Sequence, residues 1–327
     1  MHKLFALLKK LQDGRSHSGQ ALADEIGVTR SAVWQQIKQL QDMGIDIHAV
    51  FGKGYRLPSG YEFLNADLIG SHWPTEIASK LTQIDIEKIT DSTNERLLSA
   101  SATEDVHGRV FLAEYQTAGR GRRGASWLAP PGSGLCLSIA WRFQETPKAI
   151  GALSLVIGLA VRHALVGLGA TGVSVKWPND IYIEDDRGPA KIAGILIEMR
   201  SELAGPSLVV IGLGLNVLLS AAQRAAIDQN ASDLASVCND PPGRNATAGA
   251  VVQEIITALE AFGGSGFAPF REQWQQADFL KGRSIKLHIN NAAVTGIVQG
   301  VDENGLLKLQ VGNEEQTHFA GHVELLN

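Results

Sequence analysis

The chain has 327 residues, of which 44% are hydrophobic and 19% charged. This composition is typical of a folded globular protein, and the length favours two or three domains over one. A net charge of −5 argues against a general nucleic-acid-binding protein. The charge is uneven, however, because residues 1–60 carry eight Lys and Arg against five Asp and Glu, and the remainder carries 21 against 29. The N-terminal segment is therefore the part expected to meet an anionic partner.

The cysteines and the apolar runs bear on location. Cys136 and Cys238 lie far apart, form no CxxC motif and have no clustered histidines, which favours reduced core thiols in the cytoplasm over a zinc site. The N-terminus lacks the pattern of a secretory signal. The longest apolar run, residues 149–161, is shorter than the roughly 20 residues that a membrane span needs. We therefore expect it to be a buried helix of a cytoplasmic protein.

Residues 1–44 contain three predicted amphipathic helices. Leucines at helical spacing predict the first, which ends at Asp13 and Gly14. Ser18 can cap a second helix that breaks at Gly27, and Thr29 can cap a third. Two short helices joined by a tight turn are typical of a helix-turn-helix, which can place its second helix in the DNA major groove. The side chains of the third helix that we expect to face inward are Val33, Trp34, Ile37, Leu40 and Met43.

The polar face of this helix-turn-helix region, from Gly19 to Lys38, suits DNA contact. Residues 45–57 alternate around a Gly-Lys-Gly tip, which predicts a two-stranded wing. The alternative is a protein-docking module with solvated polar faces, but positive charge in an acidic chain favours DNA. The candidate DNA-contacting residues are Arg30, Ser31, Gln35, Gln36 and Lys38 on the helix and Lys53 and Arg56 on the wing.

After an expected linker at residues 58–65, the chain predicts two further domains and an α+β multidomain protein. A mixed α/β domain of about 200 residues is indicated by β-type runs that alternate with helical stretches. Its strands are expected at residues 110–115, 135–143, 173–176, 192–199 and 208–216, and its helices at residues 150–168 and 248–262. The last fifty residues contain four alternating runs separated by turn signals, which predicts a small all-β barrel. These runs are residues 284–289, 293–301, 306–311 and 317–325.

Residues 116–124 read QTAGRGRRG and follow the first of these strands. Their spacing satisfies the GxGxxG dinucleotide fingerprint, but the prolines and glycines of residues 125–134 cannot form the helix that this fingerprint requires. We therefore do not expect a Rossmann site. Three arginines among three glycines instead predict a mobile loop that folds over a polyanion and donates to phosphates. A merely solvated loop is disfavoured because ordering it without a ligand is costly in entropy.

Four other segments have polar groups or glycines close to where a predicted strand or helix begins or ends. KWPND at residues 176–180 contains Pro178, which ends a strand, so Asn179 and Asp180 are expected at a loop mouth. Lys191 follows an apparently long loop at residues 184–190 and lies at the start of an apolar strand. Taken alone, Lys176 and Lys191 could each equally well have a structural role. DSTN at residues 91–94 holds more polar groups than the capping of the next helix needs. GLGLN at residues 212–216 has two glycines that allow a ligand to approach the backbone.

The order DSTN, GRGRRG, KWPND, KIAGILIE and GLGLN resembles that of the bifunctional biotin protein ligases that double as biotin operon repressors. The similarity extends over essentially the whole chain, including the GKGYRL wing. It implies a winged helix-turn-helix over residues 1–62, a class II synthetase-like mixed α/β ligase domain over residues 66–270 and a C-terminal SH3-like β barrel over residues 275–327. Glu95, directly after DSTN, is a departure, because many relatives carry other polar residues there.

The resemblance implies an enzyme that makes biotinyl-5′-AMP from biotin and ATP, with Mg²⁺ held through the ATP phosphates rather than by a protein metal site. A lysine of the biotin carboxyl carrier protein of acetyl-CoA carboxylase then takes the biotinyl group. The adenylate would also act as corepressor by stabilising a homodimer, which would set two winged modules on a two-fold operator.

The resemblance also implies roles for individual residues. The implied biotin-contacting residues are Ser92, Thr93, Asn94, Gln116, Arg120, Gly121, Arg122 and Lys191. The implied ATP and adenylate contacts are Arg120, Arg122, Arg123, Trp127, Lys176, Asn179 and Asn216, with Trp127 between the acyl chain and the adenine. The implied catalytic residues are Lys191, Arg120 and Arg122, which would neutralise charge, and Asp180, which would accept a proton from the incoming lysine or position it.

Two other functions are weighed against this one. A regulator that senses biotin without catalysis would not need Lys191, Asp180 and the complete arginine loop. A lipoate or octanoyl ligase shares a related fold and acyl-adenylate chemistry, but it should not need the polar set at Ser92 to Asn94 together with Gln116.

Overall fold

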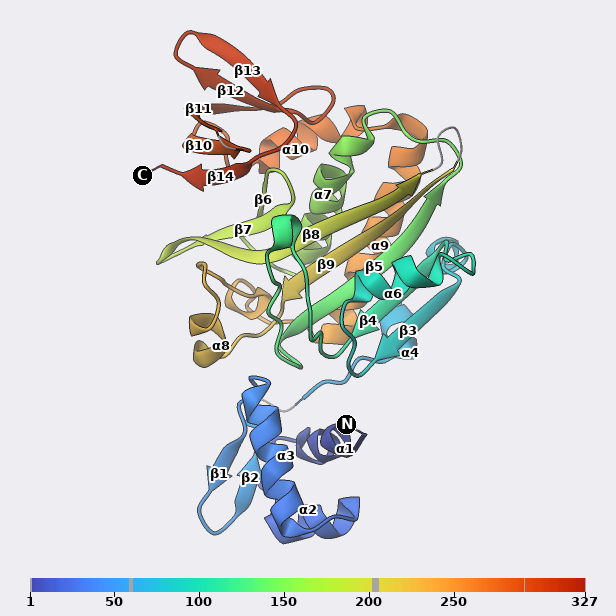
Figure 1. Cartoon of the computed structure of the whole chain (residues 1–327), viewed down its shortest axis with the longest axis vertical. Helices are drawn as coiled ribbons and strands as arrows, with labels where there is room; N and C mark the ends of the chain where they lie inside the picture. Colours follow the sequence, from blue (N-terminus) through green and yellow to red (C-terminus); the bar gives the residue numbers. More distant parts are fainter. Residues whose placement is uncertain (1, 59–60, 202–205, 291, 327) are drawn as a thin grey trace.

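The computed structural model describes residues 2–58, 61–201, 206–290 and 292–326. These residues form three parts that follow one another along the longest axis of the molecule (Figure 1). A small helical part with a two-stranded hairpin comes first, a seven-stranded sheet with helices lies in the middle, and a five-stranded sheet ends the chain.

The N-terminal part confirms the predicted winged helix-turn-helix. Its elements are α1 (His2–Leu11), α2 (Gly19–Ile26), α3 (Arg30–Asp42), β1 (His48–Val50) and β2 (Gly54–Arg56). The hydroxyls of Ser18 and Thr29 cap α2 and α3 as expected, since they accept from the backbone N–H of Ala21 and Ala32. Gly27 has a φ of 64°, the left-handed conformation that glycine adopts readily, and so makes the tight turn between them.

The expectation that Trp34 faces inward is wrong. The buried face of α3 is formed by Val33, Ile37 and Leu40, while 56% of Trp34 is exposed. The spacing explains the error, because Trp34 is one position beyond the apolar stripe and lies one turn from Lys38, whose ammonium is 5.8 Å from the indole. The indole therefore belongs to the polar outer face of α3.

The central sheet has the strand order β3-β4-β5-β9-β8-β7-β6. Only β3 and β4 pair in parallel, and the other neighbours are antiparallel, so the domain is mixed α/β as predicted. Two of its strands, β3 and β7, were not expected from the sequence. The strands are β3 (Gln83–Glu87), β4 (Arg109–Ala113), β5 (Gly134–Phe143), β6 (Ser174–Lys176), β7 (Asp180–Asp185), β8 (Gly188–Ser201) and β9 (Ser207–Asn216).

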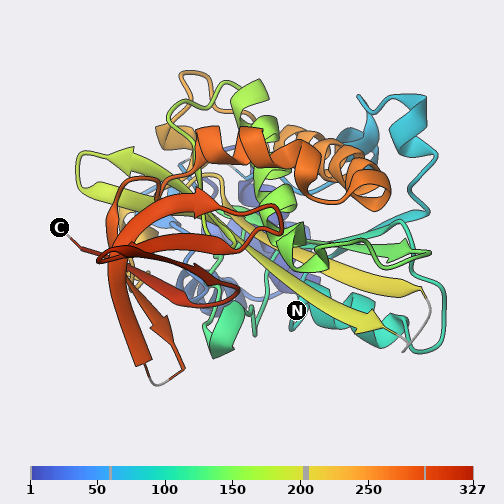
Figure 2. The same ribbon diagram turned by 90° about the horizontal axis from the view of Figure 1, so that it is seen from above.

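Helices cover both faces of this sheet. The long helices α7 (Leu153–Gly167) and α9 (Arg244–Ser265) pack together over one face, and α6 (Thr93–Ala100) packs on the other (Figures 1 and 2). The window Ile150–Gly167 is long and apolar enough to cross a membrane, but 61% of it is buried inside the protein, as expected for a core helix. Shorter helices are α4 (Ala66–Gly70), α5 (Thr75–Ala78), α8 (Ala221–Ala225) and α10 (Arg271–Ala277), and single 3₁₀ turns occupy Arg122–Gly124, Ile150–Ala152, Leu234–Ser236 and Ala268–Phe270.

The C-terminal part is an antiparallel sheet of order β13-β12-β11-β10-β14. The run predicted at residues 317–325 is divided between its two edge strands, and these edges do not pair with each other among the described residues, so a closed barrel is not confirmed. Its apolar side chains continue the core of the central domain. The strands are β10 (Ser284–Ile289), β11 (Ala292–Val301), β12 (Leu307–Val311), β13 (Glu314–His318) and β14 (His322–Leu325).

Part of the expected linker is anchored rather than free. The Glu114 carboxylate accepts from the Tyr61 hydroxyl at 2.9 Å and from the backbone N–H of Leu64 at 2.7 Å. The same carboxylate lies 2.7 Å from the buried guanidinium of Arg244, at the start of α9. On its other side the segment packs on the N-terminal part, where Phe5 and Phe63 have ring centroids 6.5 Å apart. Residues 59–60 lie outside the described residues.

Candidate ligand site

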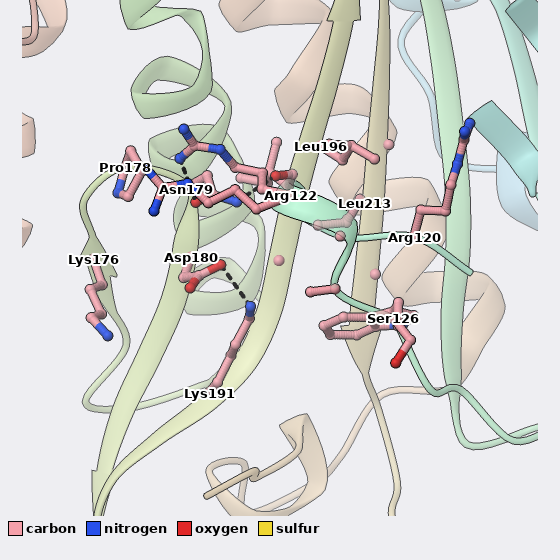
Figure 3. Close-up of a pocket in the computed structure, with 18 of the residues that line it drawn as sticks. Arg120, Arg122, Ser126, Lys176, Pro178, Asn179, Asp180, Lys191, Leu196 and Leu213 are labelled. Atoms are coloured by element: carbon pink, nitrogen blue, oxygen red, sulfur yellow. Dashed lines mark hydrogen bonds and ion pairs between the residues drawn. The ribbon is translucent and has the colours of Figure 1, made fainter. Parts of the chain in front are cut away.

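A cavity of about 500 Å³ opens where the motifs of the central domain meet. Its wall is built by the start of α6, the loop after β4, the strands β6 to β9 and the first residues of β14 (Figure 3). All but one of the predicted biotin-, ATP- and catalysis-related residues line it. These are Ser92, Thr93, Asn94, Gln116, Arg120, Gly121, Arg122, Arg123, Trp127, Lys176, Asn179, Asp180 and Lys191.

The neutral polar end of the cavity is a network around Asn94. Its side-chain oxygen accepts from the Ser138 hydroxyl at 2.6 Å, and its amide donates to the Glu198 carboxylate at 2.8 Å. Asn94 lies so close to β9 that a Cβ on Gly212 would come within 2.4 Å of its oxygen. The glycine therefore allows the amide to lie against the sheet, and the network fixes its orientation.

The expectation that a DSTN side chain caps the following helix is not met. Ser92 occupies the N-cap position, but its side chain makes no capping hydrogen bond. The side-chain oxygen of Gln116 serves instead, since it accepts from the Thr93 backbone N–H at 2.8 Å and from the Thr93 hydroxyl at 3.1 Å. The cap comes from a distant segment, which leaves the Ser92 hydroxyl available at the cavity wall.

The opposite wall is cationic. The Arg122 guanidinium donates to the Asn179 side-chain oxygen at 3.2 Å, and the Asn179 amide is itself tied to the Ile195 carbonyl at 2.7 Å. Burial, followed by the nearby charge of Arg123, lowers the pKa of Arg122. Burial likewise lowers the pKa of Lys176, whose ammonium lies 4.4 Å from the Tyr182 ring centroid. Partly buried cations of this kind favour a bound anion.

Lys191 and Asp180 form an ion pair with 2.8 Å between Nζ and Oδ1 (Figure 3). Their side chains are 15% and 19% exposed. The expected long loop at residues 184–190 is wrong, because β7 and β8 form a hairpin whose pairing runs from Asp185 and Gly188. Asp180 is accordingly the first residue of β7 rather than a loop residue, and the hairpin brings it beside Lys191.

Trp127 lies flat against the end of β9. A Cβ on Gly214 would come within 2.2 Å of its indole, so this position must lack a side chain. The Lys191 ammonium is 5.7 Å from the indole centroid. The indole therefore lies between the network around Asn94 and the cationic wall. The indole N–H is buried and finds no acceptor among the described residues.

Two predicted residues are placed otherwise than expected. The Arg120 side chain points away from Lys191 and Asp180 (Figure 3) and is ion-paired with Glu95 at 3.1 Å and Glu198 at 3.6 Å. Asn216 is the predicted residue that does not line the cavity, because its amide is buried and donates to the Ser232 carbonyl at 3.0 Å. The structure also adds Gly321, His322 and Val323, which sequence patterns could not reveal because they come from the C-terminal sheet.

The site offers no protein cage for a metal ion. Within the described ranges, no group of three or more His, Cys, Asp or Glu side chains is placed to hold one. Asp180 is the single carboxylate in the cavity wall, and it is already paired. This donor set fits a cation that arrives with a phosphate ligand better than one bound by the protein alone.

Comparison with known proteins first defines the class. Residues 86–216 match the biotin/lipoate A/B protein ligase family, and residues 3–56 match a helix-turn-helix domain. The bifunctional ligase/repressor BirA of Escherichia coli is 37% identical over 99% of this chain and 96% of its own length. That of Bacillus subtilis is 29% identical over 94% of this chain and 93% of its own. The chain therefore belongs to the family of bifunctional biotin ligases and repressors.

Other relatives agree with this assignment. The biotin--[acetyl-CoA-carboxylase] ligase of Mycobacterium tuberculosis is 32% identical over 82% of this chain and 96% of its own length. Among solved structures, the biotin protein ligase from Aquifex aeolicus in complex with biotin and ATP has a TM-score of 0.62 at 25% identity. It covers 75% of this chain and 99% of its own.

Proposed function

We propose that this protein is a biotin protein ligase that forms biotinyl-5′-AMP from biotin and ATP and transfers biotin to a lysine of the biotin carboxyl carrier protein. The adenylate is also the corepressor with which the protein represses the biotin operon. One observation carries the proposal: a single cavity joins a network of amides and hydroxyls to a cluster of cations, most of them partly buried, with an indole between them.

The neutral end suits the biotin ring. Its ureido group has two N–H donors and one carbonyl acceptor, which complement the hydroxyls of Ser92 and Thr93 and the amides of Asn94 and Gln116. The backbone of Gly121 and the arginine loop closes this end. The acyl chain then runs along Trp127 toward Lys191, and the adenine stacks on the other side of the indole.

The cationic wall suits the adenylation step. A biotin carboxylate oxygen bonds to the α-phosphorus while the bond to pyrophosphate breaks, so negative charge grows on both phosphate groups. Arg122, Lys191, Lys176 and Arg123 surround this region and stabilise that charge. A Mg²⁺ ion held by the ATP phosphates would supply further neutralisation. Arg120 joins this set once it leaves Glu95.

We assign positioning roles to Asn179, Asn216 and Asp180. Asn179 holds Arg122 in place and borders the adenylate, and Asn216 acts from behind β9 by fixing the Ser232 backbone. Asp180 holds Lys191 at 2.8 Å, so we assign it the positioning of that ammonium.

The regulatory function rests on the N-terminal part. We propose domains over residues 1–62, 66–270 and 275–327, with the helix-turn-helix binding operator DNA through α3 and the wing. Binding of the adenylate stabilises a homodimer, which presents two such modules.

A cytoplasmic location is supported by two free, buried cysteines and by the burial of α7.

The test is exchange of labelled pyrophosphate into ATP, with biotin or lipoate as the acid. We expect exchange with biotin and none with lipoate. Lys191→Gln should lower it by about 10²-fold or more, because one positioned charge is lost at the reacting phosphate. Lys148→Ala, an exposed lysine outside the cavity, is the matched control. Exchange supported only by lipoate would point to the lipoate branch, and no exchange with either acid would leave a biotin sensor.

A further inference from the structure

His322 brings the C-terminal sheet into the cavity. It is the first residue of β14, an edge strand that pairs with β10, and it lines the cavity together with Gly321 and Val323. Its side chain is exposed, whereas Lys191 and Asp180 are largely buried. An exposed imidazole on the wall of the cavity is accessible to a group that arrives from outside.

The transfer step needs a base that the deeper residues do not supply. The acceptor lysine arrives as an ammonium, and only the neutral amine can attack the acyl carbon. Among the described residues of the wall, Lys176, Lys191 and the arginines are cations, and burial raises the pKa of the Tyr182 phenol far above neutrality. The Asp180 carboxylate is bound to the Lys191 ammonium. His322 is the remaining proton acceptor.

Its surroundings keep the imidazole neutral. Partial desolvation at the cavity wall, then the charges of Lys176 on β6, His288 on β10 and Arg123 in the arginine loop, lower the pKa of His322, and Asp180 opposes them. The His288 and His322 ring centroids are 6.1 Å apart. On its own strand, the Glu324 carboxylate is engaged by His288 at 2.7 Å.

We propose that His322 is the general base of the transfer step, an inference that rests on the proposed ligase function. The imidazole takes one proton from the acceptor ammonium. The freed amine bonds to the acyl carbon of biotinyl-5′-AMP, the bond from that carbon to the phosphate oxygen breaks, and AMP leaves with the electron pair. The second amine proton passes to the departing phosphate.

The test starts from preformed biotinyl-5′-AMP bound to the enzyme and measures one turnover between about pH 5 and pH 9, because the lowered pKa of His322 places its ionisation in the acid part of this range. Two nucleophiles are compared at about pH 8, the biotin carboxyl carrier protein and hydroxylamine, which is neutral at that pH and needs no base. In His322→Ala we expect the ratio of the lysine rate to the hydroxylamine rate to fall by about 10²-fold or more. The rise of the lysine rate with pH that reflects imidazole ionisation should disappear, and added imidazole should restore part of the rate.

His318→Gln is the matched control, because His318 lies on β13 of the same sheet but does not line the cavity. It should keep the wild-type ratio. An unchanged ratio in His322→Ala, or a loss that imidazole does not restore, would overturn the assignment of the base. Failure of the wild-type protein to form the adenylate from biotin and ATP would instead overturn the proposed function.

Discussion

At the scale of single residues, the floor of the cavity depends on two positions that lack a side chain. Gly212 and Gly214 alternate with apolar residues along β9, so both face the cavity side of the sheet. Asn94 and Trp127 occupy the space that their Cβ atoms would need. The shape of the site is therefore encoded partly in residues that carry no chemistry.

Gly214→Ala tests this point. The added methyl would overlap the Trp127 indole, and the ring must move away from β9. We expect affinity for the adenylate to fall by about 10-fold to 100-fold, with a loss of roughly 1–3 kcal/mol in the free energy of unfolding. Calorimetric binding and thermal unfolding measure the two effects.

Gly264→Ala in α9 is the matched control, because nothing lies within 4 Å of its added Cβ. It should bind normally and be slightly more stable, since alanine favours a helix. Normal adenylate affinity in Gly214→Ala would show that the indole does not need its present position.

The sequence motifs predicted which residues would lie together, and all of these except Asn216 line the cavity. The cavity gathers DSTN, GRGRRG, KWPND and Lys191, which the sequence placed on separate segments. The pairing of Lys191 with Asp180 was not predictable, because it depends on a register shift in β7 and β8 between Ile181 and Tyr182. His322 was missed because packing of two sheets, rather than chain proximity, brings it to the site.

At the scale of elements, one residue of the proposed biotin-binding part of the cavity also caps a helix. Gln116 caps α6 from outside, so its amide group is both structural and available to a ligand. The two roles use different atoms, because the oxygen accepts from Thr93 and the NH₂ group is left to donate.

Two substitutions separate these roles. Gln116→Ala should lower the free energy of unfolding by about 1 kcal/mol through loss of the cap and should also weaken biotin binding. Gln116→Glu keeps an acceptor at the helix N-terminus, where negative charge is favourable, and should restore stability without restoring the donor. Equal biotin affinity in Gln116→Glu and wild type would argue that the NH₂ group does not contact biotin.

A second element-level feature is Asp278, between α10 and β10. Burial raises its pKa to about 7, although one oxygen accepts from the Leu280 N–H at 2.9 Å. The other oxygen is buried without a hydrogen-bond partner among the described residues. The folded protein therefore prefers the protonated acid at this position.

This preference predicts a pH dependence of stability. Between about pH 4 and pH 7 the folded state holds a proton that the unfolded state has lost, so stability falls as pH rises and then levels off. Asp278→Asn cannot ionise and should be more stable than wild type at pH 8, by an amount on the order of a few kcal/mol, with no difference at pH 4. Denaturant unfolding at both pH values, with the exposed Asp186→Asn as control, checks this. Equal stability of Asp278→Asn and wild type at pH 8 would contradict the raised pKa.

Long elements were predictable from periodicity, whereas several short elements of the central domain were not. The apolar runs of β5, β9 and α7 are unambiguous, whereas β3 mixes polar and apolar residues and the helices α4, α5, α8 and α10 have seven residues or fewer. β7 was not expected because it begins two residues after Pro178 and ends in acidic residues. Such segments form because neighbouring strands or helices pack on them.

At the scale of the whole molecule, charge separates the N-terminal part from the rest. The outer face of α3 and the wing expose Arg30, Lys38, Lys53 and Arg56, while the remainder of the chain is acidic. Gln36 is half-buried and contributes less to this face. Non-specific attraction to phosphates should therefore be confined to one end of the molecule.

Lys53→Ala at the wing tip should weaken binding to operator and unrelated DNA alike. Because one phosphate contact is lost, the slope of log affinity against log salt concentration should become shallower by about one. Fluorescence anisotropy at several salt concentrations measures it, and Lys148→Ala should leave the slope unchanged. A loss confined to operator DNA would show that Lys53 reads bases instead.

The order of the three parts was predictable because each has its own periodicity, but the way they join was not. The central and C-terminal sheets share one hydrophobic core. The apolar residues at this junction cannot be told apart in sequence from those that pack within a single sheet, so the shared core was not predictable. The closed C-terminal barrel was inferred from turn signals, which predicted four strands where the sheet has five and do not show whether the edges of the sheet meet.

The anchoring of residues 61–65 has a consequence for dissection of the molecule. A catalytic fragment beginning at residue 66 would bury the Glu114 carboxylate without the Tyr61 hydroxyl and the Leu64 N–H, and Arg244 would lose its bond to the Glu62 carbonyl. A DNA-binding fragment ending before residue 61 would lose the aromatic rings that cover Phe5. Residues 61–65 contribute contacts to both the N-terminal part and the central domain, so separating the two at either of these positions removes native contacts from one of the fragments.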